Sequence, residues 1–257
     1  MQQFVCLSGL PRSGSTLLSA ILSQNPLIHA EGNSAVCQLM WDMQQSCLTT
    51  AKEQLQANGR EKTTTYDLIS QIPKIYYKQI SENIVVDKCR SWTIQANIAL
   101  LEKYIDKNYK IIILERPVTD IVKSFVKLYT KNGVTGDIES KLLLPNSEPI
   151  MRSIAGVNWA KKHNQNKHFL FINYDDLIGT PEETIKRIYD FCGWTYFAHN
   201  YNHIECKYPE DDNVYGLKGM HKIRHKVEAQ PNSTVLSPKT IEKCQQIDRL
   251  QSIGTNR

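Results

Sequence analysis

The sequence has no apolar run long enough to cross a lipid bilayer, which takes about 20 consecutive apolar residues in a helix. It also has no basic-then-apolar leader, because a strand-like apolar run begins at Phe4, within a few residues of Met1. These absences argue against a membrane span and against a secretion signal. We therefore expect a cytoplasmic protein.

The sequence also lacks the cysteine and histidine patterns that mark disulfide frameworks and metal sites. Its 7 cysteines are scattered, odd in number and free of any C-x-x-C pair, which favours reduced thiols. Its histidines show no metal-ligand spacing, and there is no obvious magnesium-binding pair, although Asp87 and Glu115 both follow apolar runs. We predict a protein without a bound metal.

The composition is that of a compact enzyme. With 257 residues, of which 41% are hydrophobic, the chain can bury a full core, so we expect residues 1–257 to form a single domain. The formal net charge of +5 indicates a surface that attracts anions.

The most informative segment is GLPRSGST at residues 9–16, directly after an apolar run. Gly9 and Gly14 allow a sharp turn that brings backbone N–H groups close to an anion, and the helical pattern that follows points its N-terminus there. Ser15 stands where a nucleotide-triphosphatase loop has its lysine. Arg12 instead offers a planar set of donors to a terminal phosphate or sulfate, which favours a nucleotide with one 5′-phosphate.

Apolar runs alternate with helical patterns along the whole chain. This predicts an α/β fold, a doubly wound parallel sheet with helices on both faces and a P-loop-like phosphate loop after its first strand. The expected strands are 3–8, 83–87, 110–115 and 168–172, and the expected helices are 15–24, 36–57, 64–80, 92–106, 117–131, 149–164, 181–192 and 238–250.

Two long segments, 132–148 and 196–236, are rich in Gly, Asn, Pro and charge. Long loops in a compact domain are usually lids or binding loops, so we expect these segments to frame a second substrate. In an open parallel sheet the ligand lies beyond the carboxyl ends of the strands. We therefore expect the phosphate loop and the strand-end residues to share one site.

The segment P-R-S-G-S-T resembles the 5′-phosphosulfate loop of sulfotransferases that use 3′-phosphoadenosine 5′-phosphosulfate (PAPS), most closely in the bacterial and tyrosylprotein branches. The family's second signature, an arginine ending a central strand and a serine eight positions later, is matched by Arg116 and Ser124. Lys88 and Tyr174 match a lysine and a tyrosine that follow other strands. The basic run at 219–224 resembles a late loop that closes over the nucleotide. The resemblance follows essentially the whole chain in order.

The resemblance implies transfer of a sulfuryl group from PAPS to an acceptor hydroxyl or amine, with adenosine 3′,5′-bisphosphate (PAP) as product. Positioning and charge stabilisation would do most of the catalysis, with Arg12 and Lys88 acting on the developing charge. The residues that the resemblance assigns to the nucleotide are Arg12, Ser13, Gly14, Ser15, Thr16, Leu17, Arg116, Ser124, Tyr174, Gly219, Lys222 and Arg224.

The general base is where the sequence departs from the relatives it resembles. In the tyrosylprotein branch a Gly-Glu-Glu-Thr segment after the first helix supplies a catalytic glutamate, and here Asn33 falls at that place. Glu31, two residues earlier, is the nearby carboxylate able to take the acceptor proton, with His29 second. We therefore predict Glu31 as the base, and the sequence leaves the acceptor open.

Two other classes of function are compatible with parts of the sequence. A P-loop nucleotide kinase or another phosphotransferase has the same strand–loop–helix arrangement, although this chain lacks the lysine that such enzymes carry in the loop. A nucleic-acid-binding module is supported only by the net charge and the basic run at 218–226, and it would bind with a steep salt dependence. We expect a nucleotide donor and an acceptor as partners, and no nucleic acid.

Overall fold

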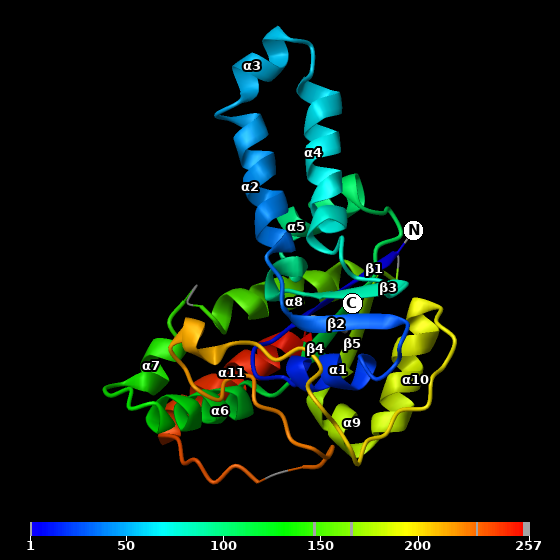
Figure 1. Ribbon diagram of the computed structural model, residues 1–257. Helices are drawn as coiled ribbons and strands as arrows, with labels where there is room; N and C mark the ends of the chain where they lie inside the picture. Colours follow the sequence, from blue (N-terminus) through cyan, green and yellow to red (C-terminus); the bar gives the residue numbers. More distant parts are fainter. Residues whose placement is uncertain (1, 146–147, 165–166, 230, 254–257) are drawn as a thin grey trace.

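A parallel β-sheet forms the centre of the computed structural model, which describes residues 2–145, 148–164, 167–229 and 231–253. The sheet has five strands in the order β2-β3-β1-β4-β5, all parallel to their neighbours (Figure 1). This confirms the doubly wound α/β class. The strands are β1 (Gln3–Gly9), β2 (Ile28–Asn33), β3 (Ile84–Lys88), β4 (Ile111–Glu115) and β5 (Phe169–Asn173).

Helices cover both faces of the sheet. Successive residues of a strand point to opposite faces, so each face contributes apolar side chains to its own core. Val5 and Leu7 of β1 belong to a core completed by α1 and α10, whereas Cys6 belongs to a core completed by α2, α5, α6 and α8. The helical elements are α1 (Ser15–Leu22), α2 (Val36–Leu48), α3 (Lys52–Ala57), α4 (Glu61–Tyr76), η1 (Arg90–Thr93), α5 (Gln95–Tyr104), α6 (Val118–Lys131), α7 (Ile138–Leu142), α8 (Met151–Lys162), α9 (Tyr174–Gly179), α10 (Pro181–Cys192), η3 (Asp212–Tyr215) and α11 (Pro238–Ile253).

The described helices include none with both the length and the apolar character needed to cross a bilayer. The two segments expected to be loops are mostly irregular, with α7 in the first and η3 in the second. Residues 146, 147 and 230 of these segments lie outside the described residues.

The secondary structure differs from the sequence-based expectations at several places: α7, α9 and η3 were not expected, and the helix expected over 64–80 is α4. Two further differences have a physical reason. The strand β2 was not expected, because a short edge strand that contains His29 and Glu31 has no dense apolar run. The expected continuous helix over 36–57 ends at Leu48 and resumes at Lys52. At Thr49 the backbone leaves helical geometry (φ −126°, ψ −81°), and the Thr49 hydroxyl donates to a backbone carbonyl one turn earlier, a bond that competes with helix formation.

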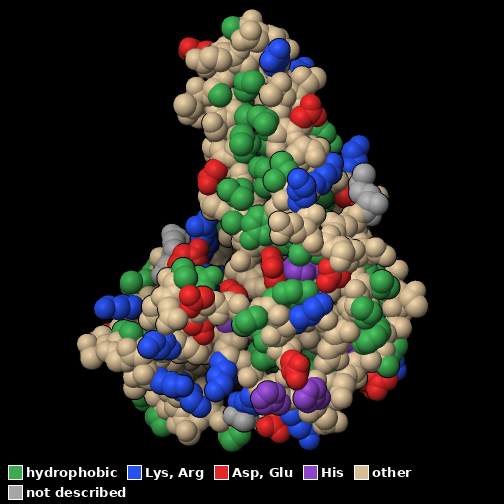
Figure 2. Space-filling model, in the orientation of Figure 1, with side chains coloured by type: hydrophobic (Ala, Val, Ile, Leu, Met, Phe, Trp, Pro, Cys, Tyr) green, Lys and Arg blue, Asp and Glu red, His purple; other side chains and the backbone are tan. Residues whose placement is uncertain are grey.

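The helices α2, α3 and α4 project from the sheet as an arm (Figure 1). Met40 and Ile69 are fully buried where α2 packs against α4. Hydrophobic side chains also gather along the outside of the arm (Figure 2), and Ile75 is one of its exposed apolar residues. The orientation of the arm is therefore set at its base, where it meets the sheet.

A buried carboxyl group, that of Asp87 at the end of β3, ties the base of the arm to the sheet. Its oxygens accept hydrogen bonds from the Ser34 hydroxyl (2.5 Å), the Tyr77 hydroxyl (2.7 Å) and the Trp92 indole N–H (2.5 Å). Burial raises the pKa of Asp87, while the three donors act in the opposite direction. The network joins β3 to the starts of α2 and η1 and to the end of α4, and so fixes the strand end that carries Lys88.

Replacing Tyr77 with Phe removes one donor from this buried carboxyl group. We expect the free energy of unfolding, measured by urea denaturation, to fall by about 1–3 kcal/mol, the usual cost of leaving a buried polar group without a hydrogen-bond partner. The control is Tyr66→Phe on the same arm, because the Tyr66 side chain is 47% exposed. Equal losses in the two variants would contradict the role of the Asp87 network.

Candidate active site

The carboxyl ends of the strands meet at one edge of the sheet, and a cavity of about 360 Å³ opens there. β1 lies between β3 and β4, so the strands that follow β1 in the chain lie first on one side of it and then on the other. Ligands bind at such a switch point in open parallel sheets. The lining comes from the loop after β1, from Lys88 at the end of β3, from Arg116 after β4, from Tyr174 after β5 and from residues 219–224. The fold thus gathers distant segments around one space.

Two glycines of the phosphate loop allow close backbone approaches. A Cβ at Gly9 (φ +128°) would lie 2.1 Å from the Leu114 carbonyl oxygen, and a Cβ at Gly14 (φ +93°) would lie 2.9 Å from the Tyr174 ring. Arg12, between them, also has a left-handed backbone (φ +57°), which is uncommon for a residue with a side chain. The loop therefore adopts a turn that few other sequences permit.

Arg12 and Arg116 lie together at the centre of the cavity wall. Arg12 Nε donates to Ser124 Oγ (3.0 Å), and its guanidinium also donates to the Met220 carbonyl. Arg116 donates to the Arg12 carbonyl (2.9 Å) and stacks on the Tyr174 ring at 4.1 Å from its centroid. Burial, followed by the nearby Arg116, lowers the pKa of Arg12. Two cations held this close favour an anion between or beside them.

The charge of the lining is strongly positive. Arg116 Nε is buried without a hydrogen-bond partner among the described residues, so it has a donor to offer a ligand. Among the residues that line the cavity, Glu228 is the one carboxylate, and the cations are Arg12, Lys88, Arg90, Arg116, Lys127, Lys131, Lys222, Arg224 and Lys226. The site therefore suits a ligand with several negative charges.

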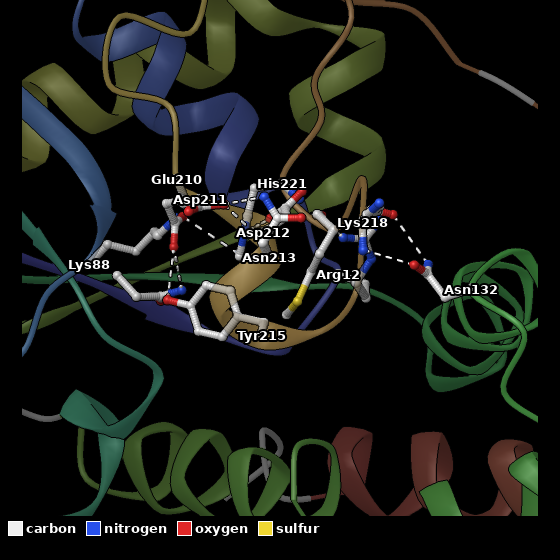
Figure 3. Close-up of polar contacts among 12 residues, drawn as sticks. Arg12, Lys88, Asn132, Glu210, Asp211, Asp212, Asn213, Tyr215, Lys218 and His221 are labelled. Carbon is white, nitrogen blue, oxygen red and sulfur yellow. Dashed lines mark hydrogen bonds and ion pairs between the residues drawn. The ribbon is translucent and has the colours of Figure 1, made fainter.

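Lys88 is 4% exposed and pairs with a carboxylate from a distant loop. Its Nζ lies 2.8 Å from Glu210 Oε1 (Figure 3). The other oxygen, Oε2, accepts from Asn33 Nδ2 (3.2 Å) and from the Tyr215 hydroxyl (3.4 Å). A buried lysine requires such a partner, and Glu210 meets that need at the edge of the cavity.

The structure brings almost all of the residues predicted from the sequence into this cavity. Ser13 and Glu31 are the exceptions. The Ser13 side chain is buried, and its hydroxyl donates to the Leu10 carbonyl instead of lining the cavity. Glu31 lines a small neighbouring cavity, and its Oε2 lies 3.2 Å from His29 Nε2. The residues that line the main cavity are Arg12, Gly14, Ser15, Thr16, Leu17, Lys88, Arg116, Ser124, Tyr174, Gly219, Lys222 and Arg224.

Several lining residues were missed from the sequence. Lys127 and Lys131 of α6 follow Ser124 at helical spacing and share its face, so that periodicity was an available signal. Asn33 and His221 come from β2 and from an irregular loop, where no periodic pattern indicates them. In the part of the chain that the structure describes, no group of three or more His, Cys, Asp or Glu side chains is placed to hold a metal ion.

Comparison with known proteins places the chain in one family. The model of the sulfotransferase family matches residues 5–198, and the chain belongs to that family. No curated protein gives a significant match.

Solved sulfotransferases share the fold at low sequence identity. A sulfotransferase domain from the curacin biosynthetic pathway is 16% identical with a TM-score of 0.61, covering 98% of each chain. A sulfotransferase from Alicyclobacillus acidocaldarius is 12% identical with a TM-score of 0.60, covering 99% of this chain and 94% of its own. Mouse sulfotransferase SULT7A1, complexed with PAP, is 15% identical with a TM-score of 0.54, covering 100% of this chain and 85% of its own.

Replacing Arg116 with Ala removes a buried guanidinium that has a free donor. We expect binding of PAP to weaken about 10- to 100-fold, and binding of adenosine 5′-monophosphate, which has no 3′-phosphate, to change much less. Isothermal titration with both nucleotides makes the comparison. Arg152→Ala is the control, because the Arg152 side chain is 59% exposed on α8. Equal weakening for the two nucleotides would remove Arg116 from the 3′-phosphate.

Proposed function

We propose that this sulfotransferase takes its sulfuryl group from PAPS and transfers it to an acceptor hydroxyl or amine. The observation that carries the proposal is the convergence of Arg12, Lys88, Arg116 and residues 219–224 on one cavity with an excess of cations. A donor with a 3′-phosphate and a 5′-phosphosulfate needs positive charge at two ends of one pocket. The PAP bound to the similar mouse enzyme supports this choice of donor.

The parts of the site suit the two ends of this donor. The backbone N–H groups of residues 13–17, with the Ser15 and Thr16 hydroxyls, would hold the 5′-phosphosulfate at the start of α1. Arg116 and Ser124 would hold the 3′-phosphate. Residues 219–224 of the late loop would cover the nucleotide, because Gly219, Lys222 and Arg224 line the same cavity.

Sulfuryl transfer moves negative charge onto the oxygen that leaves with the nucleotide. A cation placed at that oxygen stabilises the transition state more than the ground state, which is the condition for catalysis. Arg12 lies in the phosphate loop after β1 and Lys88 lies at the end of β3, which pairs with β1, and both side chains line the cavity. We assign the charge stabilisation to these two side chains.

Wild-type protein is expected to bind PAP without magnesium. At a concentration of 100 times Kd, a ligand selective for the folded state adds about 2.7 kcal/mol to the free energy of unfolding, so the melting temperature should rise. Differential scanning fluorimetry with PAP, in EDTA and in magnesium, measures this. Magnesium-dependent ATP turnover without a PAP effect would instead indicate a P-loop phosphotransferase.

Replacing Lys88 with Ala should lower kcat about 100-fold or more, the usual loss for one preorganised group that stabilises developing charge. Nucleotide affinity should change little, because the effect is confined to the transition state. The assay follows label from ³⁵S-PAPS into the small molecules of a cell extract. Lys74→Ala, at an exposed position of α4, is the control. An unchanged kcat would exclude Lys88 from catalysis.

A further inference from the structure

Transfer to a hydroxyl group requires a group that takes the hydroxyl proton. Glu228 is the carboxylate among the residues that line the main cavity. Lys88 contacts a different carboxylate, that of Glu210, at 2.8 Å. Glu210 lies on the irregular chain between α10 and η3, far from Lys88 in sequence. Its side chain is 11% exposed, so this is a partly buried carboxylate brought to the site by the fold.

The chain at the end of β2 is shaped to receive Glu210. Gly32 has no side chain there, and a Cβ at that position would lie 2.2 Å from Glu210 Cγ. The next residue, Asn33, donates from Nδ2 to Glu210 Oε2 at 3.2 Å. An alanine at Gly32 would force the carboxylate away from Lys88. The local sequence of β2 thus fits the carboxylate of a distant loop.

Glu210 also lies where two cavities adjoin. It lines a second, more open cavity of about 500 Å³, together with Ile204, Pro209 and Ile223. His221, Lys222 and Ile223 line this second cavity and the nucleotide cavity alike. An acceptor in the second cavity would therefore meet Glu210 on its way to a sulfuryl group held beside Lys88.

The groups that face Glu210 keep it in the form that accepts a proton. Burial raises the pKa of Glu210, but Lys88 and His221 together hold it below its ordinary value, and a hydrogen bond from the Asn33 backbone acts in the same direction. Tyr215 is the other titratable neighbour, and it donates its hydroxyl. The carboxylate is ionised at neutral pH.

His221 is held in place rather than free. Its Nδ1 lies 2.7 Å from Asp212 Oδ1, its backbone N–H donates to the same carboxylate, and its Nε2 lies 3.6 Å from Glu210 Oε1 (Figure 3). Both ring nitrogens therefore face carboxylates. His221 is therefore fixed by Asp212 at ion-pair distance from Glu210, which suits a positioning neighbour of Glu210 better than it suits a base.

We propose that Glu210 is the general base of the reaction, with Asn33 and His221 as its positioning residues; this rests on the proposed transfer from PAPS. The acceptor O–H bond breaks and its proton moves to a carboxylate oxygen of Glu210. The acceptor oxygen forms a bond to sulfur, and the bond from sulfur to the bridging oxygen breaks, leaving its electron pair on the phosphate of PAP. Lys88, beside Glu210, stabilises that leaving oxygen.

Replacing Glu210 with Gln keeps the shape and removes the proton acceptor. We expect kcat for label transfer from ³⁵S-PAPS to the acceptors of a cell extract to fall about 100-fold or more, the usual contribution of a general base. PAP affinity, measured by titration, should stay within about threefold, since the 3′-phosphate and 5′-phosphate contacts are untouched. Glu183→Gln, at an exposed position of α10, is the matched control.

Two further readouts separate a base from a structural role. In wild type, kcat/KM should fall as pH drops through a pKa below the ordinary glutamate value of about 4.3, and this acid limb should be absent in Glu210→Gln. The double variant Asn33→Glu, Glu210→Gln returns a carboxylate to the same place from β2. We expect kcat of this double variant to be at least tenfold higher than that of Glu210→Gln, which corresponds to about 1.4 kcal/mol of transition-state stabilisation.

Other outcomes assign the base elsewhere. Full activity of Glu210→Gln together with loss in Glu31→Gln would return the role to Glu31 and overturn the proposal. A loss in His221→Gln as large as that in Glu210→Gln, with an acid limb in the histidine range, would make His221 the base. If wild type neither binds PAP nor transfers label, the proposed function fails, independently of which residue is the base.

Discussion

The active-site edge of the sheet depends on one buried group, the carboxyl group of Asp87. A fully buried carboxyl group is costly unless donors surround it, and its three donors come from the chain after β2, from the end of α4 and from η1. Satisfying Asp87 therefore fixes how these segments meet the end of β3. Lys88 is the next residue, so the position of the strand end that carries it follows from a network whose residues do not line the cavity.

The segment between α10 and α11 is held to this edge by two contacts, made by Arg12 and by Lys88. Arg12 donates to the Met220 carbonyl, and Lys88 pairs with Glu210. Arg12 and Lys88 are the side chains proposed to act on the developing charge, so the segment between α10 and α11 meets the site at these two cations. The protein contacts supply the partners that buried cations need, and they keep the guanidinium and the ammonium preorganised at the cavity. The position of this segment and the preorganisation of the two cations therefore depend on each other.

The fold was predictable where the sequence carries dense local signals. The central strands β1, β3 and β4 and the edge strand β5 read as dense apolar runs, so these four were expected, and their carboxyl ends place Arg12, Lys88, Arg116 and Tyr174 at one edge. The edge strand β2 was missed because it is half exposed at its end and contains polar residues. Membership of the sulfotransferase family was confirmed. The nucleotide contacts, Glu31 as base and the single domain stay predictions, and the position of Glu31 beside His29 does not favour it as base.

Glu210 could not have been found from local sequence, and the reason is physical. It sits in an irregular segment with neither a period of 3.6 nor a period of 2, and its partner Lys88 is 122 residues away. The local sequence does offer two carboxylates, but the fold gives Asp87 to three hydrogen-bond donors and places Glu31 beside His29. A buried lysine needs a counter-charge, so Lys88 takes one from a distant segment. The absence of a side chain at Gly32 leaves the space that the Glu210 side chain occupies, which is why the two distant segments fit together.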